Sequence, residues 1–467
     1  MKKMDLVFIP APGSGHLFSA IEFANLLVER DQRLSITILI IKYPKKDNTT
    51  KLPSASHSNI SFIELPHVEP PPMELLIKSI EKYYTDFIDS HRTCVKDAIV
   101  NHVLPNSTKL LGLVVDMFCT SMIDVANELG VLSYLFLTSG AGFLAFLFHL
   151  AHRHDLVGRE FEESDHESLV PGYSNPVPLN ILPDFACNKD GYNSFLNHGR
   201  RFKETKGIIV NTFLDLESNV VNSISNYHDV PPVYTAGPLI NQKNQNTVQC
   251  KNHDEIMKWL DDQPPSSVVF LCFGGFGCFG VPQLKEIALG LERSGYRFLW
   301  SIRVASEDKP PKHIENIDHK TILPGGFLER TKGRGLTCGW APQVEILAHK
   351  AVRGFVSHCG WNSIMESLWF GVPILTWPLY AEQRLNAFQM VKELGLAFEF
   401  KLDTRRYSDD IVKGDEIAKA VKYLMEEGSE VRKKVKDVSV KSRKALEPGR
   451  SSYASVGHWM ETMFASN

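Results

Sequence analysis

Short runs of β-branched and aliphatic residues alternate with helical stretches along nearly the whole chain of 467 residues. At the start, Leu6–Ile9 predicts a strand, and the apolar residues between His16 and Arg30 recur at helical spacing. Strands that alternate with helices of this length predict parallel βαβ units, because a parallel pair needs a long crossover connection. The chain is therefore expected to form doubly wound α/β structure.

The alternation occurs in two blocks. The first block predicts strands at 35–41, 60–65, 111–115, 134–137 and 207–211 and helices at 74–100, 122–129 and 142–152. The second predicts strands at 267–273, 296–302, 335–338, 354–357 and 373–377, helices at 282–293, 361–370 and 382–394, charged helices over 415–446 and a last helix at 453–464.

A polar stretch without apolar periodicity separates the blocks and predicts a linker at 241–253. We therefore expect a first domain at 1–240, a second at 254–450, and a C-terminal helix within 451–467 that packs back on the first. Two doubly wound domains of this kind bind ligands at the carboxyl ends of their strands, so we expect them to face each other across a cleft.

The composition limits the classes of partner. Apolar residues make up 43% and charged residues 22%, and the net charge of −3 shows no basic excess, so we expect no nucleic-acid partner. The longest strongly apolar stretch, 141–150, is shorter than the roughly 20 residues of a membrane span.

The eight cysteines are scattered without a CxxC pair, which argues for free thiols and against a disulfide framework or a zinc site. The first residues form a short β-like run that ends at Pro10 and Pro12, not an apolar signal helix. We expect a cytoplasmic, monomeric protein with no membrane span and no bound metal.

A glycine-rich pattern supports one alternative function. Gly275–Gly280 satisfies GxGxxG directly after a predicted strand and before a predicted helix, as in NAD(P)-dependent oxidoreductases. That function also needs an acidic residue at the end of the second strand to bind the ribose. The second strand runs into Arg303 without Asp or Glu, although Arg303 is compatible with NADP. Otherwise the pattern is a turn that lets backbone amides approach a ligand closely.

The segment Trp340–Gln383 concentrates the groups that a nucleotide needs. A predicted strand runs into His358, and the next predicted helix opens at 361. A helix N-terminus offers amides and the positive end of the helix dipole, which suits a phosphate. His358, Asn362 and Ser363 add side-chain donors there. Glu366 lies one turn beyond Asn362, where a carboxylate can accept from both ribose hydroxyls.

Each of these residues also has a purely structural interpretation. Ser363 and Glu366 fit a capping box, in which they only close the helix. His358 can be a satisfied structural histidine, and Trp340 and Trp361 can be core residues. Nucleotide binding is favoured because the features occur together.

The segment resembles the signature box of the plant UDP-dependent glycosyltransferases of family 1 over its full length. The resemblance extends to Pro10–His16, Val114–Asp116 and Trp259–Pro264, and it is strongest to the branch that glucosylates flavonoids, other phenolics and terpenoid alcohols. It implies the GT-B fold of two Rossmann-like domains, with 1–240 binding the acceptor and carrying the catalytic base, and 254–450 binding the UDP-sugar.

The resemblance also implies roles for the donor-site residues. Trp340 stacks on uracil, Ala341 and Gln343 lie near the base, and Glu366 holds the ribose. The diphosphate is contacted by His358, Asn362 and Ser363. The sugar hydroxyls are read by Trp361, Glu382 and Gln383, with Thr138 reaching across from the first domain. Gln383 favours glucose over galactose, because His is the usual galactose marker of the family at this position.

His16 and Asp116 are the candidate catalytic residues. His16 lies in the loop that leaves the first predicted strand and Asp116 ends strand 111–115, so both are expected at the carboxyl edge of one sheet. An imidazole that titrates near neutrality suits a general base. A carboxylate on its other nitrogen would fix the tautomer and stabilise the imidazolium.

Both residues have structural alternatives: His16 can be a polar residue that starts a helix, and Asp116 a buried N-cap. Their separation of 100 positions does not predict contact, whereas their match to the family pattern does.

The resemblance implies transfer of glucose from UDP-glucose to a hydroxyl group of a small plant secondary metabolite. It implies a single displacement with inversion that gives a β-glucoside, without a metal, a cofactor or a covalent intermediate. Asp261-Asp262 is expected to be a solvated helix end, not a metal motif.

The predicted acceptor pocket consists of Ser14, Phe118, Cys119, Phe143, Phe146, Phe185 and Tyr380; the helix residues Phe143 and Phe146 are as readily explained by core packing.

The remaining alternative is a non-catalytic protein that binds a nucleotide-sugar or another small molecule. Such a protein would keep the segment Trp340–Gln383 but would have no need of a base, and the presence of His16 with Asp116 argues against it.

Gly275 departs from the family pattern, which has a serine here that helps to hold the phosphates, and Cys278 stands where a second serine is common. The absent hydroxyl removes a hydrogen bond to a charged group worth about 1–3 kcal/mol unless backbone amides or water substitute. We predict that Gly275→Ser lowers the KM for the UDP-sugar and preserves the reaction. An unchanged or higher donor KM in steady-state kinetics would contradict this prediction.

Overall fold

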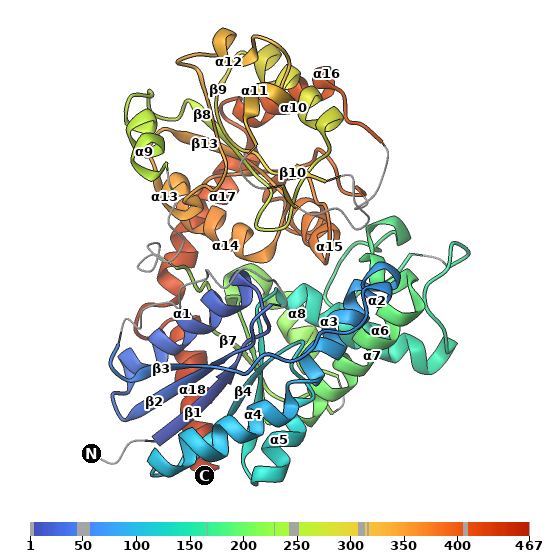
Figure 1. Cartoon of the computed structure of the whole chain (residues 1–467), viewed down its shortest axis with the longest axis vertical. Helices are drawn as coiled ribbons and strands as arrows, with labels where there is room; N and C mark the ends of the chain where they lie inside the picture. The colour runs from blue at the N-terminus through green and yellow to red at the C-terminus, as the bar shows by residue number, and fades with distance from the viewer. Residues whose placement is uncertain are drawn as a thin grey trace. The chain divides into compact units, whose positions relative to one another are not determined.

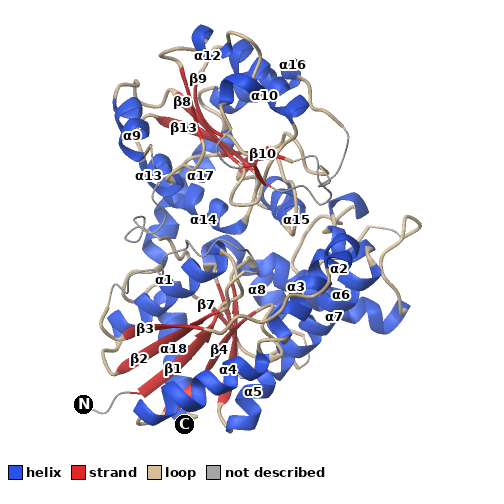
Figure 2. Cartoon of the chain, in the orientation of Figure 1, coloured by secondary structure: helices blue, strands red, loops and turns tan. Residues whose placement is uncertain are grey.

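The computed structural model describes residues 4–43, 57–165, 167–227, 229–241, 252–306, 313–314, 317–404 and 410–466. The chain divides into two compact units. The first consists of Met1–Leu179, Asp184–Thr247 and Ser442–Asn467, and the second of Asn180–Pro183 and Val248–Lys441. Each unit has a central sheet flanked by helices (Figures 1 and 2).

The described sheet of the first unit has seven parallel strands in the order β3-β2-β1-β4-β5-β6-β7. They are β1 (Met4–Ile9), β2 (Leu34–Ile40), β3 (Ile60–Glu64), β4 (Leu110–Asp116), β5 (Leu132–Leu137), β6 (Ile208–Val210) and β7 (Val233–Thr235). The helices are α1 (Ser14–Arg30), α2 (Met73–Lys78), α3 (Ile80–Asp89), α4 (Arg92–Ala98), α5 (Met122–Leu129), α6 (Ala141–Val157), α7 (Lys189–Arg201), α8 (Leu214–Ser225) and α18 (Ser451–Ala465).

The described sheet of the second unit has six parallel strands in the order β12-β9-β8-β13-β14-β15. They are β8 (Val268–Cys272), β9 (Arg297–Ser301), β12 (Gly335–Cys338), β13 (Val352–Ser357), β14 (Ile374–Thr376) and β15 (Ala397–Phe398), and β10 (Val304–Ala305) pairs separately with β11 (His313–Ile314). The helices are α9 (His253–Asp261), α10 (Val281–Ser294), α11 (His319–Ile322), α12 (Phe327–Arg330), α13 (Gln343–Ala348), α14 (Trp361–Phe370), α15 (Gln383–Phe388), α16 (Gly414–Met425) and α17 (Glu430–Ala445).

The two sheets share one topology, which confirms the predicted pair of doubly wound domains. Counted in chain order within each sheet, both begin 3-2-1-4-5-6, and the first sheet has one further strand. The order reverses between the first and fourth strands, β1 and β4 in one unit and β8 and β13 in the other. Ligands of open parallel sheets bind outside the carboxyl ends at this reversal.

The predicted helix at 74–100 is wrong as a single element. It is divided at Ser79, whose backbone is extended with φ −155° and whose hydroxyl accepts from the Lys82 amide, so that Ser79 ends α2 and caps α3. A serine that caps a helix competes with helix continuation through this local hydrogen bond. The chain then bends again before α4.

The unit boundaries also differ from the expected domain limits. The second unit ends at Lys441, within α17, and not at 450. Because α17 is one continuous charged helix, no break in the sequence marks this point. The predicted linker at 241–253 lies largely outside the described residues, and α9 begins at its last position, His253.

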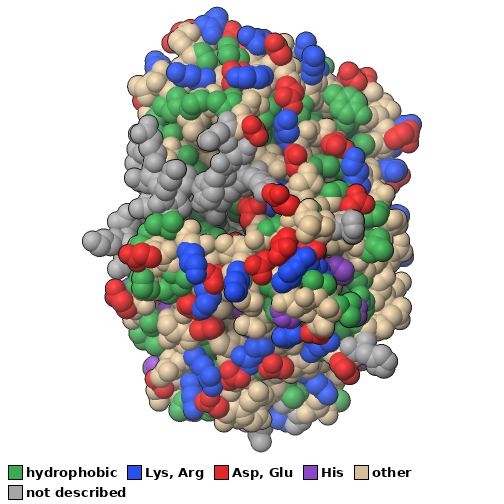
Figure 3. All heavy atoms as spheres, turned by 90° about the vertical axis from the view of Figure 1, so that its right-hand side faces the viewer, with side chains coloured by type: hydrophobic (Ala, Val, Ile, Leu, Met, Phe, Trp, Pro, Cys, Tyr) green, Lys and Arg blue, Asp and Glu red, His purple; other side chains and the backbone are tan. Residues whose placement is uncertain are grey.

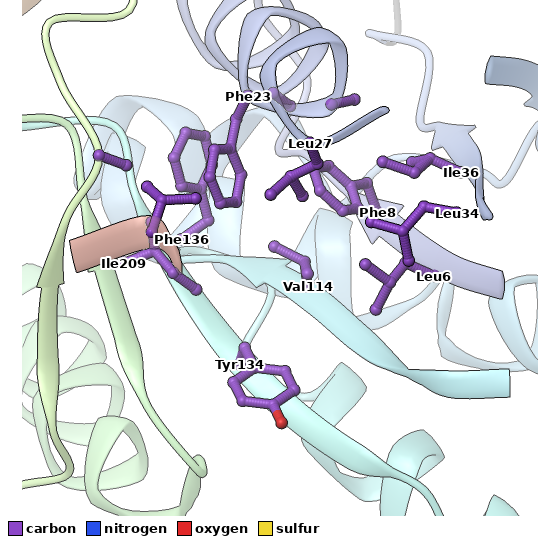
Figure 4. Packing of buried hydrophobic residues seen from close by; sticks show 14 of the residues in the cluster. Leu6, Phe8, Phe23, Leu27, Leu34, Ile36, Val114, Tyr134, Phe136 and Ile209 are labelled. Atoms are coloured by element: carbon purple, nitrogen blue, oxygen red, sulfur yellow. The ribbon is translucent and has the colours of Figure 1, made fainter. Parts of the chain in front are cut away.

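The C-terminal helix α18 belongs to the first unit and covers the same face of the sheet as α1. Figure 4 shows the core beneath α1, where the ring of Phe23 stacks on that of Phe136 with centroids 5.2 Å apart. Trp459 of α18 is fully buried beside Phe23 and meets the ring of Tyr134 edge-on at 5.3 Å. Hydrogen bonds from the Ser452 hydroxyl to the Gly237 carbonyl and from the Thr235 amide to Ser455 fasten the helix.

Within the described part of the chain, every helix is too short or too polar to cross a membrane. Acidic and basic side chains are interspersed over the face that Figure 3 presents.

We predict that Trp459→Ala destabilises the first unit by about 3–5 kcal/mol, because it removes a fully buried indole and leaves a cavity between α1 and α18. Leu156→Ala is the matched control, since Leu156 is 75% exposed on the same unit and its removal should cost less than about 0.5 kcal/mol. Urea unfolding measures both. A Trp459→Ala variant as stable as the control would contradict the proposed packing.

Candidate active site

The first group of candidate residues lies at the carboxyl edge of the first unit's sheet. His16 is in the first turn of α1, directly after β1, and Asp116 is the last residue of β4. Because β1 and β4 are neighbours, the two residues lie at the topological reversal of the sheet. The turn into α1 needs Gly13, whose φ of +133° is rarely adopted by residues with a side chain.

His16 and Asp116 are in contact. The imidazole Nδ1 lies 2.8 Å from Asp116 Oδ2, and the Asp116 side chain is fully buried whereas that of His16 is 25% exposed. A carboxylate only accepts hydrogen bonds, so Nδ1 carries the proton and Nε2 has the lone pair. The amide of Phe118 donates to Asp116 Oδ1 at 3.1 Å and fixes the carboxylate from its other side.

The structural alternative for Asp116 does not fit, and that for His16 does not account for its side-chain contacts. The residue that caps α5 is Ser121, so Asp116 is not an N-cap. His16 lies near the start of a helix, but its ring is held by Asp116 and by Thr138, whose hydroxyl is 3.1 Å from Nδ1. Thr138 follows β5 and therefore lies at the same edge of the sheet.

Phe118 is a half-buried member of an aromatic cluster beside His16. Its ring meets the imidazole edge-on with centroids 5.7 Å apart. It also meets Tyr84 at 5.5 Å and Phe195 at 5.6 Å, again edge-on. Ser14, in the first turn of α1, is exposed.

The other predicted acceptor residues of this unit are buried, and the three phenylalanines among them contact one another. Phe146 and Cys119 have no exposed surface, and Phe143 and Phe185 are each 3% exposed. The ring of Phe185 lies 6.3 Å from that of Phe143 and 6.1 Å from that of Phe146. In this structure these side chains therefore belong to the buried packing next to Phe118, which we call the wall behind Phe118.

The second group of candidates lies at the carboxyl edge of the second unit's sheet. Trp340 follows β12 and is 39% exposed, although it is a large apolar residue. The guanidinium of Arg303, which follows β9, lies over its ring at 5.0 Å and donates to the Gly275 carbonyl at 2.8 Å. Arg303 thus links the glycine-rich turn to the exposed indole. Ala341, the residue after Trp340, is buried.

His358, which follows β13, is enclosed by two glycines. A Cβ on Gly274 would come within 2.5 Å of its Nε2, and one on Gly360 within 2.6 Å, so neither position accepts a larger residue. His358 is only 6% exposed, and burial lowers its pKa to about 4, so the ring is neutral near pH 7. Its Nδ1 has no hydrogen-bond partner among the described residues.

Glu366 is held by Gln343 of α13. The Gln343 amide nitrogen donates to Glu366 Oε2 at 2.7 Å and to Ser363 Oγ at 2.8 Å. Burial raises the pKa of Glu366 to about 7, and the bond from Gln343 opposes this rise. The capping-box interpretation is wrong, because it requires Ser363 to be the N-cap, whereas α14 is capped at Gly360, three residues earlier.

The start of α14 gathers further candidates. Trp361 is buried at the first helical position, with Asn362 half-buried beside it. Cys359, just before the cap, has φ +62°, an unfavourable conformation that hydrogen bonds hold: its amide donates to Ser357 Oγ and its carbonyl accepts from Asn386.

Gln383 closes the turn after β14. Its Oε1 accepts from the amides of Leu379 and Tyr380 at 2.9 and 3.0 Å, and Glu382 stands half-buried before it at the start of α15. Tyr380, predicted as an acceptor residue, lies in the second unit with its ring 6.1 Å from His358. It therefore lies among the donor candidates.

Two negative expectations concern metal binding. Asp261 ends α9 with a side chain that is 70% exposed, as expected for a solvated helix end. Among the described residues, no group of three or more His, Cys, Asp or Glu side chains is placed to hold a metal ion.

The sequence analysis did not predict one helix, α7, and one hydrogen bond of the site. α7 was missed because Gly191, Asn193 and Gly199 have low helix propensity, although Tyr192 and Phe195 follow helical spacing. The bond from Gln343 to Glu366 joins residues of two helices and has no signal in the sequence.

Comparisons with known proteins are consistent with this geometry. The family described as "UDP-glucoronosyl and UDP-glucosyl transferase" matches residues 219–443. UDP-glycosyltransferase 71K1 of Malus domestica is 50% identical over 482 residues, covering 100% of both chains. UDP-glucose flavonoid 3-O-glucosyltransferase 6 of Fragaria ananassa is 47% identical, also over 100% of both.

A solved structure supports the fold. The crystal structure of Medicago truncatula UGT71G1 complexed with UDP-glucose matches with a TM-score of 0.88 and 48% identity, over 99% of this chain and 98% of that one. Both parallel-sheet units, and therefore the GT-B fold, are shared. The chain belongs to the plant UDP-glycosyltransferases of family 1, enzymes that use a UDP-sugar as co-substrate.

Proposed function

We propose that this enzyme transfers glucose from UDP-glucose to a hydroxyl group of a small plant secondary metabolite, a flavonoid, another phenolic or a terpenoid alcohol, and that it forms a β-glucoside. The relative from Fragaria ananassa is named for glucose transfer to flavonoids, and the Medicago truncatula structure contains UDP-glucose. The observation that carries the proposal is the contact between His16 Nδ1 and the buried Asp116 carboxylate.

In the proposed mechanism His16 is the general base. With Nδ1 engaged by Asp116, Nε2 is the atom that accepts the proton of the acceptor hydroxyl as its oxygen attacks the anomeric carbon. The positive charge that develops on the ring is stabilised by Asp116, whose buried position strengthens the interaction. A single attack of this kind inverts the α-linked donor to a β-linked product.

We propose that the second unit holds the donor. Uracil stacks on the exposed face of Trp340 near Ala341 and Gln343, and the ribose hydroxyls donate to Glu366. The diphosphate is bound by His358, Asn362, Ser363 and the positive end of the α14 dipole, which also stabilises the leaving group. Since Gln383 Oε1 is engaged by backbone amides, its NH₂ group serves the sugar hydroxyls together with Trp361, Glu382 and Thr138.

For the acceptor we propose Phe118 as the contacting ring. It is half-buried and its edge meets His16, so an aromatic or terpenoid body packed on Phe118 would bring a hydroxyl close to the base. Ser14, exposed in the first turn of α1, is a polar neighbour of the base. The buried Phe143, Phe146, Phe185 and Cys119 are assigned to supporting this wall.

The two alternative functions lose their support. The glycine-rich pattern at Gly275–Gly280 does not indicate a nicotinamide cofactor, because Arg303 at the end of the neighbouring strand engages Trp340 and Gly275. A non-catalytic binding protein would not explain the buried Asp116 that orients His16, and the relatives are transferases.

The proposal is tested by incubating the enzyme with UDP-glucose and a panel of phenolics and terpenoid alcohols, and detecting a hexose gain by mass spectrometry. His16→Ala should abolish transfer and still bind UDP. Asp116→Asn should lower kcat by about 10²–10⁴-fold, because the amide no longer stabilises the imidazolium. Near-normal turnover by His16→Ala, or no hexose gain with any acceptor, would overturn the proposal.

A pH dependence of donor binding follows from Glu366. Ribose hydroxyls donate to a carboxylate, so binding requires the ionised form, and the affinity for UDP-glucose should fall about tenfold per pH unit below about 7. UDP-glucose is the suitable ligand, because its phosphates do not titrate near neutrality, and His358 stays neutral over this range.

The measurement is isothermal titration calorimetry of UDP-glucose between about pH 5.5 and 8. Glu366→Gln is predicted to bind more weakly at the upper end and to lose the dependence. An unchanged dependence in Glu366→Gln would assign it to another group.

A further inference from the structure

A buried imidazole that has no role in the proposed mechanism lies close behind the catalytic pair. His198 of α7 is 2% exposed and makes two hydrogen bonds. Its Nδ1 is 2.8 Å from the hydroxyl of Thr120, and its Nε2 is 3.0 Å from that of Thr85 on α3. The ring thus connects α7 to α3 through Thr85, and to the turn after β4 through Thr120.

The charge state of His198 allows both bonds at once. Burial lowers its pKa to about 4; of the charges that act on it, Asp116 opposes this effect and Arg201 adds to it. The ring is therefore neutral near pH 7, with one nitrogen that donates and one that accepts. A threonine hydroxyl can do either, so both partners are satisfied.

The turn that His198 holds is the one that orients Asp116. The Asp116 carbonyl accepts from the Cys119 amide at 2.8 Å, and its carboxylate accepts from the Phe118 amide. Thr120 is the next residue of the turn and is itself buried. A displacement of Thr120 would therefore move the donor that fixes the Asp116 carboxylate against His16.

The same imidazole supports the ring of Phe118. His198 meets it edge-on with centroids 5.9 Å apart, and Phe195, one turn earlier on α7, packs on the same ring. Phe118 in turn meets His16. His198 thus reaches the catalytic base along two paths, through the Asp116 turn and through Phe118.

We propose that His198 is a positioning residue for the catalytic pair: its bond to Thr120 fixes the turn that aims Asp116 and Phe118 at His16. This inference rests on the proposed function, since it requires His16 to be the base. The hydrogen bond to Thr85 fixes the orientation of the His198 ring.

Two substitutions separate the bonds of His198. The side-chain amide of Asn stands where Nδ1 lies and can keep the bond to Thr120, whereas that of Gln reaches the place of Nε2 and can keep the bond to Thr85. We expect His198→Leu and His198→Gln to lower kcat by on the order of 10- to 100-fold, and His198→Asn to recover most of the loss. The KM for UDP-glucose should be unchanged in all three, because the proposed donor residues other than Thr138 belong to the second unit.

Thr120→Val and Thr85→Val make the same comparison without touching the histidine. Valine keeps the shape of threonine and removes the hydroxyl, so Thr120→Val should reproduce the low kcat and Thr85→Val should retain most of the activity. In Thr120→Val the acid limb of kcat against pH should move to lower pH, because a misaimed Asp116 stabilises the protonated His16 less.

His91→Leu is the control for loss of a buried histidine. His91 is 1% exposed in the same unit, but the one partner of its Nδ1 among the described residues is the Phe87 carbonyl of the preceding helical turn. Its replacement should lower the thermal midpoint and leave kcat and its pH profile unchanged, which is the behaviour of a purely structural residue.

Two results would overturn the inference: wild-type kcat in Thr120→Val, or a low kcat in His198→Leu that His198→Asn does not recover. His16→Ala is measured in parallel to separate the two proposals. If His16→Ala is active, the proposed function itself fails; if it is inactive while the His198 and Thr120 variants behave like His91→Leu, only the positioning role fails.

Discussion

Parallel strands place all of their carboxyl ends at one edge of a sheet, and in both units the first strand lies beside the fourth. This arrangement decides where functional residues can gather, because the loops after these two strands leave in opposite directions and open a crevice. In the first unit the crevice brings together His16 and Asp116. In the second it brings the glycine-rich turn against His358, where only a glycine at 274 leaves room for the imidazole.

Burial gives the ionisable groups of the two crevices different properties. The Asp116 carboxylate is buried with a histidine partner and one backbone donor, the Phe118 amide, which suits a carboxylate that must support a positive charge. Glu366 is half-buried beside the neutral Gln343, and desolvation raises its pKa to about 7. His358 is buried among glycines and stays neutral, so it can donate a hydrogen bond without adding a full charge. We propose that base catalysis belongs to the first crevice and anion binding to the second.

Much of this could be predicted from the sequence, wherever the determinants were local. The bounds of α5, β12 and α14 match the predicted segments, because strong periodicity and terminal glycines mark them. The break at Ser79 was missed because a serine within an apolar period gives no sign that it caps a new helix. The boundary at Lys441 was missed because a continuous helix crosses it.

The same distinction between local and long-range determinants applies to the candidate site. Strand ends predicted that His16, Asp116 and His358 would lie at carboxyl edges. Their partners could not be predicted, since the contacts of His198 with Thr120 and of Gln343 with Glu366 depend on how helices pack. Periodicity likewise could not distinguish the half-buried Phe118 from the fully buried Phe146.

The stereochemistry of the product tests the central claim most directly, because a hydroxyl activated by His16 attacks the α-linked donor once and from the opposite face. Proton NMR of the glucoside formed from UDP-α-glucose distinguishes the two anomers by the coupling of the anomeric proton. A β-glucoside alone, with the large coupling of a diaxial pair, is the predicted result. An α-glucoside would contradict a single displacement driven by the His16–Asp116 pair.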